Sequence, residues 1–130
     1  MKILLDTCAV LWCVLSPENL SARAREVLST EDTVVHVSPI SCAEVACGVQ
    51  RGRVELDRHW KLWFRHFVDL NGWRSVSIDL RIVEESYSLP EYSHRDPADR
   101  IIIATARLLQ CPVVTADRRM MHYPHVDVLW

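Results

Sequence analysis

The chain opens with Lys2-Ile3-Leu4-Leu5-Asp6, a short apolar run that ends at a carboxylate. This run is the first of several that together indicate the fold class. Short apolar runs rich in branched residues are typical of buried strands. Similar runs recur at 34–37, 76–78, 113–115 and 126–129, between segments with helical spacing. Strands that alternate with helices predict an α/β fold, with a central parallel sheet flanked by helices on both faces.

The predicted helices lie at 20–28, 41–50, 57–70, 79–88 and 98–109. The third is unusual because one face is almost wholly apolar and largely aromatic, carrying Leu56, Trp60, Trp63, Phe64, Phe67 and Leu70. Such a stripe is usually buried, although a partner-binding surface has the same pattern. We favour core packing.

Length and composition describe one globular domain, residues 1–130. Of the residues, 49% are hydrophobic and 25% charged, which is typical of a folded soluble protein. Asp6 interrupts the apolar N-terminal run, which argues against a signal peptide or membrane span, so we expect a cytoplasmic protein without membrane contact. The five cysteines show no Cys-x-x-Cys spacing and are expected to be reduced and buried.

The net charge of -2 argues against a protein that grips nucleic acid over a broad surface, since such binding needs many Lys and Arg contacts to phosphates. A local basic rim near the acidic motifs remains compatible with this charge. Its candidates are Arg95, Arg100, Arg118 and Arg119.

Four acids follow predicted strands or begin predicted helices. Asp6 follows the first strand and Asp117 follows the strand at 113–115, while Glu44 and Asp99 are expected in the first turns of two helices. In open parallel sheets, sites form just outside the carboxyl ends of the strands. The four carboxylates are therefore predicted to converge on one crevice.

Each acid also has an ordinary structural explanation. Ser41-Cys42-Ala43-Glu44 fits a capping box, in which the Glu side chain bonds back to the cap residue. Asp96 and Asp117 are suited to helix capping. Asp6 is harder to explain in this way, because an acid in apolar surroundings must be capping, paired or metal-bound.

Clustered carboxylates repel one another and need a cation to stay ionised together. Oxygen ligands without a matching His or Cys set favour Mg²⁺ (or Mn²⁺), which commonly takes substrate phosphate oxygens as further ligands. The pair His122 and His125 indicates a surface loop rather than a metal site. The metal's preference for phosphate oxygens predicts phosphoryl chemistry. No Gly-rich phosphate loop is present, which argues against nucleotide binding of the P-loop or dinucleotide type.

Four motifs in order make the chain similar to a known family. They are Leu4-Leu5-Asp6-Thr7, Ala43-Glu44-Val45-Ala46, His94-Arg95-Asp96-Pro97-Ala98-Asp99-Arg100 with Ile103-Ala104-Thr105-Ala106, and Thr115-Ala116-Asp117. Together they resemble a PIN-domain ribonuclease of the VapC toxin type, over essentially the whole chain. The combined order and spacing are far more specific than any single motif.

The resemblance implies a Mg²⁺- or Mn²⁺-dependent endoribonuclease, the toxin of a toxin-antitoxin system, held inactive by a VapB-like antitoxin. It also implies a homodimer. Asp6, Glu44, Asp99 and Asp117 match the family's four acids, with Asp6 and Asp99 as the first choices for direct metal ligands. Thr7 and Thr115 match flanking polar positions, and Asp96 is an extra acid that we interpret as a helix cap with an auxiliary role.

The chain departs from the family pattern at three positions near the acids. Many relatives carry Trp before the Glu and Lys four residues after it, where this chain has Ala43 and Gly48, and Cys8 stands where His or Asn is common. The acids are intact, so the departures bear on substrate contacts rather than on the existence of the site. Two alternatives stay open, a structure-specific DNA nuclease and a non-catalytic binding module.

Overall fold

Strand β1 (Lys2–Leu5) is the centre of a five-stranded sheet in the computed structural model, which describes residues 1–130. The order is β3-β2-β1-β4-β5 and every pair is parallel. The other strands are β2 (Val34–Val37), β3 (Arg74–Ser75), β4 (Val113–Val114) and β5 (Val128–Leu129). Leu4 pairs with His36 on one side and with Val113 on the other, which fixes the register.

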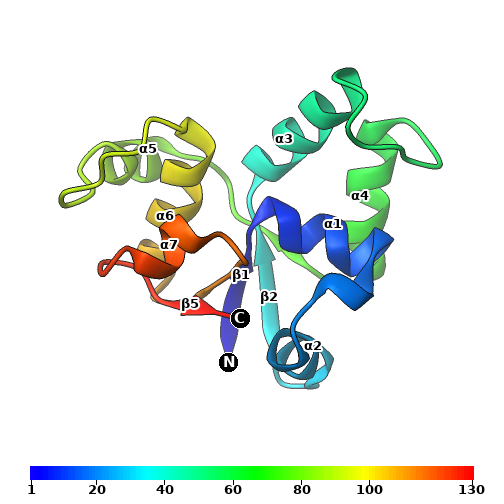
Figure 1. The fold of residues 1–130 in the computed structure, drawn as a ribbon, viewed down its shortest axis with the longest axis horizontal. Coiled ribbons are helices and arrows are strands. Elements are labelled where there is room, and N and C mark those ends of the chain that lie inside the picture. The colour runs from blue at the N-terminus through cyan, green and yellow to red at the C-terminus, as the bar shows by residue number, and fades with distance from the viewer.

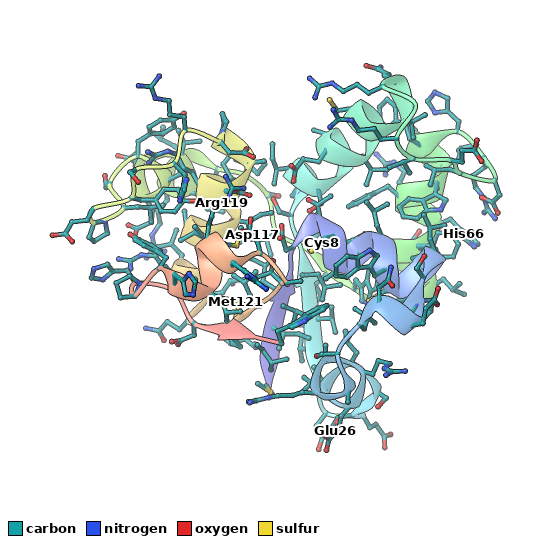
Figure 2. The ribbon with its side chains drawn as sticks, in the orientation of Figure 1. Cys8, Glu26, His66, Asp117, Arg119 and Met121 are labelled. Carbon is teal, nitrogen blue, oxygen red and sulfur yellow. The ribbon has the colours of Figure 1, made fainter.

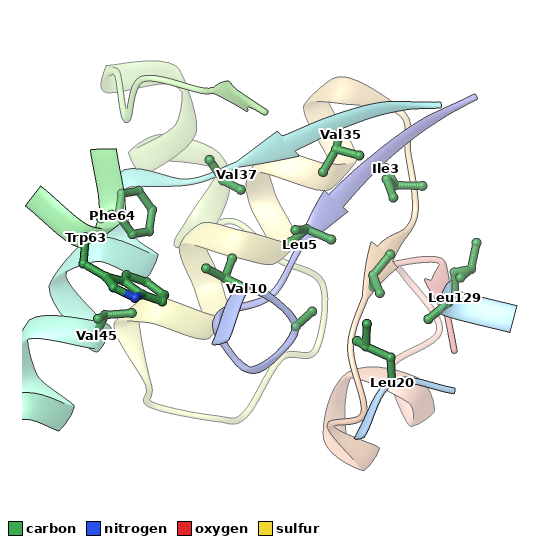
Figure 3. Packing of buried hydrophobic residues seen from close by; sticks show 13 residues of the cluster. Ile3, Leu5, Val10, Leu20, Val35, Val37, Val45, Trp63, Phe64 and Leu129 are labelled. Atoms are coloured by element: carbon green, nitrogen blue, oxygen red, sulfur yellow. The ribbon is translucent and has the colours of Figure 1, made fainter. Parts of the chain in front are cut away.

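The alternation of side chains along β1 divides the core into two parts. Ile3 and Leu5 point into a cluster with α1 (Thr7–Leu15), α2 (Ala22–Ser29), α3 (Pro39–Gln50) and α4 (Trp60–Leu70) (Figure 3). Leu4 joins a second cluster with α6 (Pro97–Leu109) and α7 (Arg118–His122). Figure 1 shows these two groups of helices on either side of β1 and β2. The predicted α/β class, with helices on both faces of a parallel sheet, is confirmed.

The remaining elements are peripheral. A short 3-10 turn (Pro17–Asn19) joins α1 to α2, and α5 (Leu80–Ser86) packs against α6. Most predicted helices differ from the observed ones by one to three residues at their ends, as expected of sequence-based boundaries. No helix is both long and apolar enough to cross a membrane.

The third strand was predicted at 76–78 and lies instead at Arg74–Ser75. Its partner β2 ends at Val37, because Ser38 begins the cap of α3, so pairing stops after His36 and Val37. Only the amide of Val76 still reaches the Val37 carbonyl, at 2.9 Å. The length of β2, rather than the apolar run at 76–78, therefore determines where this edge strand lies.

Helix α3 begins earlier than predicted, which removes the capping box. Ser38 caps it by accepting a hydrogen bond from the Ile40 amide at 3.2 Å, and Pro39 occupies the first turn, where its missing N–H costs nothing. Ser41 is buried inside the helix, and Glu44 lies in the second turn rather than the first. The capping-box interpretation of Glu44 is wrong.

The aromatic face of α4 packs mainly into the core. Trp63 and Phe64 are buried, and Trp60 and Phe67 are partly buried against the same cluster. Core packing is therefore confirmed for the aromatic side chains, whereas Leu70 at the end of the predicted stripe is exposed.

All five cysteines are free thiols, as predicted, but only Cys111 is buried and the others are partly exposed. Partial exposure corrects the expectation that all five lie in the core. Gly48, where many relatives have Lys, faces the side chain of Val54, and a Cβ added there would lie 2.9 Å from Val54 Cγ2. A side chain at position 48 would therefore require the side chain of Val54 to shift.

Candidate active site

Asp6 lies at the carboxyl end of β1 with both carboxylate oxygens hydrogen-bonded. Its Oδ1 accepts from the amide of Thr7 at 2.8 Å, which caps α1, and its Oδ2 accepts from the hydroxyl of Thr115 at 2.7 Å. Thr115 follows β4, the strand next to β1, and its oxygen also accepts from the Asp117 amide at 3.0 Å. Two neighbouring strands thus fix the position of Asp6, which is 7% exposed.

Glu44 reaches the same end of the sheet from α3. The hydroxyl of Thr7 donates to Glu44 Oε1 and lies 2.9 Å from the hydroxyl of buried Ser41. The first residue of α1 therefore connects the acid of α3 to the acid that ends β1. Ser41 was absent from the predicted site residues, because its distance from Thr7 depends on how α1 packs on α3.

Asp99 and Asp117 are linked by one guanidinium group. Arg119 Nη2 lies 3.2 Å from Asp99 Oδ2 and 3.3 Å from Asp117 Oδ2. Asp117 also caps α7 through the amide of Arg119 at 2.8 Å, so the capping interpretation of Asp117 holds alongside its place in the site. Figure 2 shows Asp117 and Arg119 at the start of α7, with Cys8 at the start of α1 across from them.

Asp96 caps α6 by accepting from the amide of Ala98 at 2.9 Å, as its interpretation as a cap predicted. Its charge nevertheless acts on the site, because it raises the pKa of both Glu44 and Asp99. The structure therefore brings the four predicted acids together at one end of the sheet, with Asp96 at the margin.

Burial and mutual repulsion raise the pKa of three of the four acids, which disfavours their ionised forms. Burial, followed by the charges of Asp96, Asp6 and Asp117, raises the pKa of Asp99 to about 7. Burial also raises the pKa of Asp6 and of Glu44, against the hydrogen bonds from Thr115 and Thr7. Burial would raise the pKa of Asp117 too, but the bonds and charge of Arg119 outweigh it and lower this pKa.

The donor set fits a hard divalent cation by its chemistry, since it consists of carboxylate and hydroxyl oxygens that carry excess negative charge. The arrangement is not a ready-made metal cage, because no group of three His, Cys, Asp or Glu side chains is close enough to hold an ion. Arg119 supplies positive charge between two of the acids instead. An ion that binds Asp99 and Asp117 through their Oδ2 atoms would therefore compete with Arg119.

The raised pKa of Asp99 predicts a cost in stability that depends on pH. The folded protein holds this proton up to about pH 7, whereas the unfolded chain releases it near 3.8, so the carboxyl destabilises the fold increasingly as pH rises between these values. In EDTA at pH 8, we expect Asp99→Asn to be more stable than the parent by about 1–3 kcal/mol. Urea unfolding measures the difference, which should shrink steadily toward pH 4. Equal stability at pH 8 would contradict the prediction.

Sequence reasoning named Arg119 only as one of several candidates for a basic rim. Its place two residues after Asp117 would have been a usable signal, because that spacing puts it in the first turn of a helix at the same sheet edge. Arg100, another candidate, is tied to the fold instead, donating to the carbonyls of Ser86 and Tyr92 at 3.1 Å each.

Comparison with known proteins places the chain in a family. The family model described as PIN domain matches residues 3–126. The chain is 30% identical over 123 residues to Ribonuclease VapC22 of Mycobacterium tuberculosis, covering 95% of this chain and 92% of that protein.

Solved structures share the fold at lower sequence identity. FitAcB from Neisseria gonorrhoeae has a TM-score of 0.68 with 23% identity, covering 98% of this chain and 96% of that one. VapBC2 from Rickettsia felis, bound to a DNA fragment from its promoter, has a TM-score of 0.67 with 13% identity, covering 99% of this chain and 98% of that one. The family model and the 30% identity together show that the chain belongs to the PIN-domain family and is of the VapC type.

Proposed function

We propose that this protein is an endoribonuclease that depends on a divalent metal ion, Mg²⁺ or Mn²⁺, and is the toxin of a type II toxin-antitoxin system. The observation that carries the proposal is the convergence of Asp6, Glu44, Asp99 and Asp117 at the carboxyl ends of the strands. A cluster of four carboxylates that a single guanidinium neutralises only in part is costly to maintain unless it binds a cation. The similarity to a protein named as a ribonuclease supports RNA as the substrate.

Asp6 and Asp99 are the proposed direct ligands, because they are the most buried of the four acids and come from opposite sides of the site. Glu44 and Asp117 complete the ligand set. Thr7 and Thr115 hold Glu44 and Asp6 in position through their hydroxyls, which keeps the carboxylate oxygens from turning away. A bound ion would supply Lewis-acid stabilisation of the scissile phosphate and lower the pKa of an attacking water.

Arg119 is suited to a role in substrate binding once it leaves Asp99. Its side chain is 49% exposed and rooted at the start of α7, so it can turn toward solvent without disturbing the core. Guanidinium groups bind phosphate oxygens in the same forked geometry that they use for carboxylates. We therefore assign Arg119 to a phosphate of the bound strand.

A VapB-like antitoxin is the proposed regulatory partner, and a homodimer the proposed assembly. The antitoxin would lay an amphipathic helix in a groove lined by the early helices and place a basic side chain among the acids. The contacts of Arg119 support the second part, since a guanidinium already fits between Asp99 and Asp117 in the chain alone. The fold neighbours include a toxin-antitoxin complex from Klebsiella pneumoniae, at 21% identity and a TM-score of 0.66.

The test is cleavage of matched single-stranded RNA and DNA by the purified protein, freed of any bound antitoxin. We expect RNA to be cut with Mg²⁺ or Mn²⁺ and to stay intact with EDTA. Because metal-assisted attack needs no ribose 2′-hydroxyl as nucleophile, preference for RNA must come from strand shape and 2′-hydroxyl contacts. Cleavage of DNA alone would establish a DNA nuclease, and binding of RNA without cleavage of either strand would favour the binding module.

A further inference from the structure

A second concave site adjoins the acids on the far side of Arg119. It is a cavity of about 340 Å³ between the loop after α5 and the end of α7. Its aromatic and basic lining residues are Tyr92, His94, Arg119, His122 and Tyr123, and Glu91, Ser93 and Pro124 complete the lining. Ligand cavities range from about 300 to 1,000 Å³, so this one can take a group no larger than a single nucleotide. Neither the proposed catalytic acids nor the hydrophobic core accounts for the two histidines that line it.

The aromatic rings of this cavity contact one another in a chain. The rings of Tyr92 and Tyr123 have centroids 4.9 Å apart, and His94 lies against Tyr92 at 5.3 Å. Two polar contacts hold these rings in place: the Tyr123 hydroxyl donates to the Pro90 carbonyl at 2.6 Å, and Arg100 lies over Tyr92 at 5.2 Å. Tyr92 and Tyr123 are each 8% exposed, so the ring surface open to a flat ligand is that of partly exposed His94 and exposed His122, which lie beside a tyrosine base that is fixed before binding.

One side chain that lines the cavity has a buried hydroxyl without a hydrogen-bond partner. The hydroxyl of Tyr92 is the only buried side-chain N or O atom in the molecule without a hydrogen-bond partner. A buried polar group in this condition needs an explanation, such as a partner that arrives with a ligand. Burial, and then the nearby charge of Asp99, raises the pKa of Tyr92.

Arg119 connects the cavity to the acids, since it lines the cavity and also contacts Asp99 and Asp117. His94 lines the same cavity and lies against Tyr92 beside this boundary. A strand whose phosphate lies at the acids would therefore meet a guanidinium next, and then aromatic rings. This order matches a scissile phosphate at the acids, the neighbouring backbone phosphate at Arg119 and the attached base at the rings.

We propose that this cavity binds the nucleotide next to the scissile phosphate, with its base on the His94 and Tyr92 side and its backbone on Arg119. The proposal rests on the proposed nuclease function and adds a substrate subsite to it. Unpaired bases stack on aromatic side chains in single-stranded RNA recognition, and such stacking tolerates any base. The cavity therefore selects unpaired strands rather than a particular base.

The test uses His94→Ala and His122→Ala, because both histidines line the cavity without contacting the acids. The control is His66→Ala, an exposed histidine on α4 that lies on the far side of the molecule from Arg119 (Figure 2). We measure the Kd for a labelled 10-residue oligoribonucleotide in EDTA by anisotropy, and then KM and kcat with Mn²⁺. All variants must melt like the parent.

We expect each cavity variant to raise Kd and KM by about 5- to 10-fold with kcat at saturating RNA within twofold of the parent. His94→Phe should restore most of the affinity, because it keeps a ring against Tyr92. Unchanged Kd and KM in both cavity variants, with RNA still cut by the parent, would overturn the subsite and leave the nuclease standing. A parent that binds RNA through His94 and His122 but cuts nothing would retain the subsite and remove the proposed nuclease.

Discussion

Asp6→Asn should lower RNA cleavage by at least about 10³-fold while the protein stays folded, since it removes a buried charge from the proposed metal site. Asn retains the side-chain oxygen that accepts from the Thr7 amide, and Asn and Asp are equally good helix caps, so α1 should keep its first turn. The measurement is initial cleavage rate with Mn²⁺, together with Mn²⁺ affinity and the melting temperature.

The matched control for this variant is Asp79→Asn. Asp79 also caps a helix, α5, accepting from the Ile82 amide at 2.9 Å, but it is not among the acids of the site. Cleavage should be unchanged in this control. If Asp6→Asn kept full activity, or lost it only because it unfolded, Asp6 would be a structural cap and the four-acid mechanism would fail.

Trp63→Ala should be the most destabilising single truncation in the aromatic face of α4, costing about 3–5 kcal/mol. Trp63 is 1% exposed and packs against Phe67 with ring centroids 5.3 Å apart, so its removal leaves a large cavity under the helix. Because domains of this size are stable by about 5–15 kcal/mol, the loss is a large part of the total. Urea unfolding measures it directly.

Leu62→Ala, on the same helix, separates packing from helix propensity. Leu62 is 63% exposed, and Leu and Ala have similar helix propensities, so the expected change in unfolding free energy is within about 0.5 kcal/mol. A small effect of Trp63→Ala together with loss of antitoxin binding would instead mean that this face serves a partner. That outcome would reverse the assignment of Trp63 to the core.

Most of the site could be placed from local sequence. Asp6 and Asp117 each follow an apolar run, and a parallel sheet brings the ends of neighbouring strands to one edge, so their proximity follows from topology alone. Asp99 follows from the helix start at Asp96-Pro97, which the structure retains. Glu44 was placed near the site as a first-turn residue of a helix expected to begin at Ser41, whereas α3 begins at Pro39 and puts Glu44 in its second turn.

The sequence by itself determined the α/β class, the buried strand at the N-terminus and the set of acids at the sheet edge. These features depend on local periodicity and on the fixed geometry of parallel strands. Only the tertiary structure decided that Thr7 bonds Glu44, that Arg119 joins Asp99 to Asp117, and that aromatic rings adjoin the site. Those contacts join residues far apart in the chain or depend on side-chain rotation, and neither is fixed by spacing along the sequence.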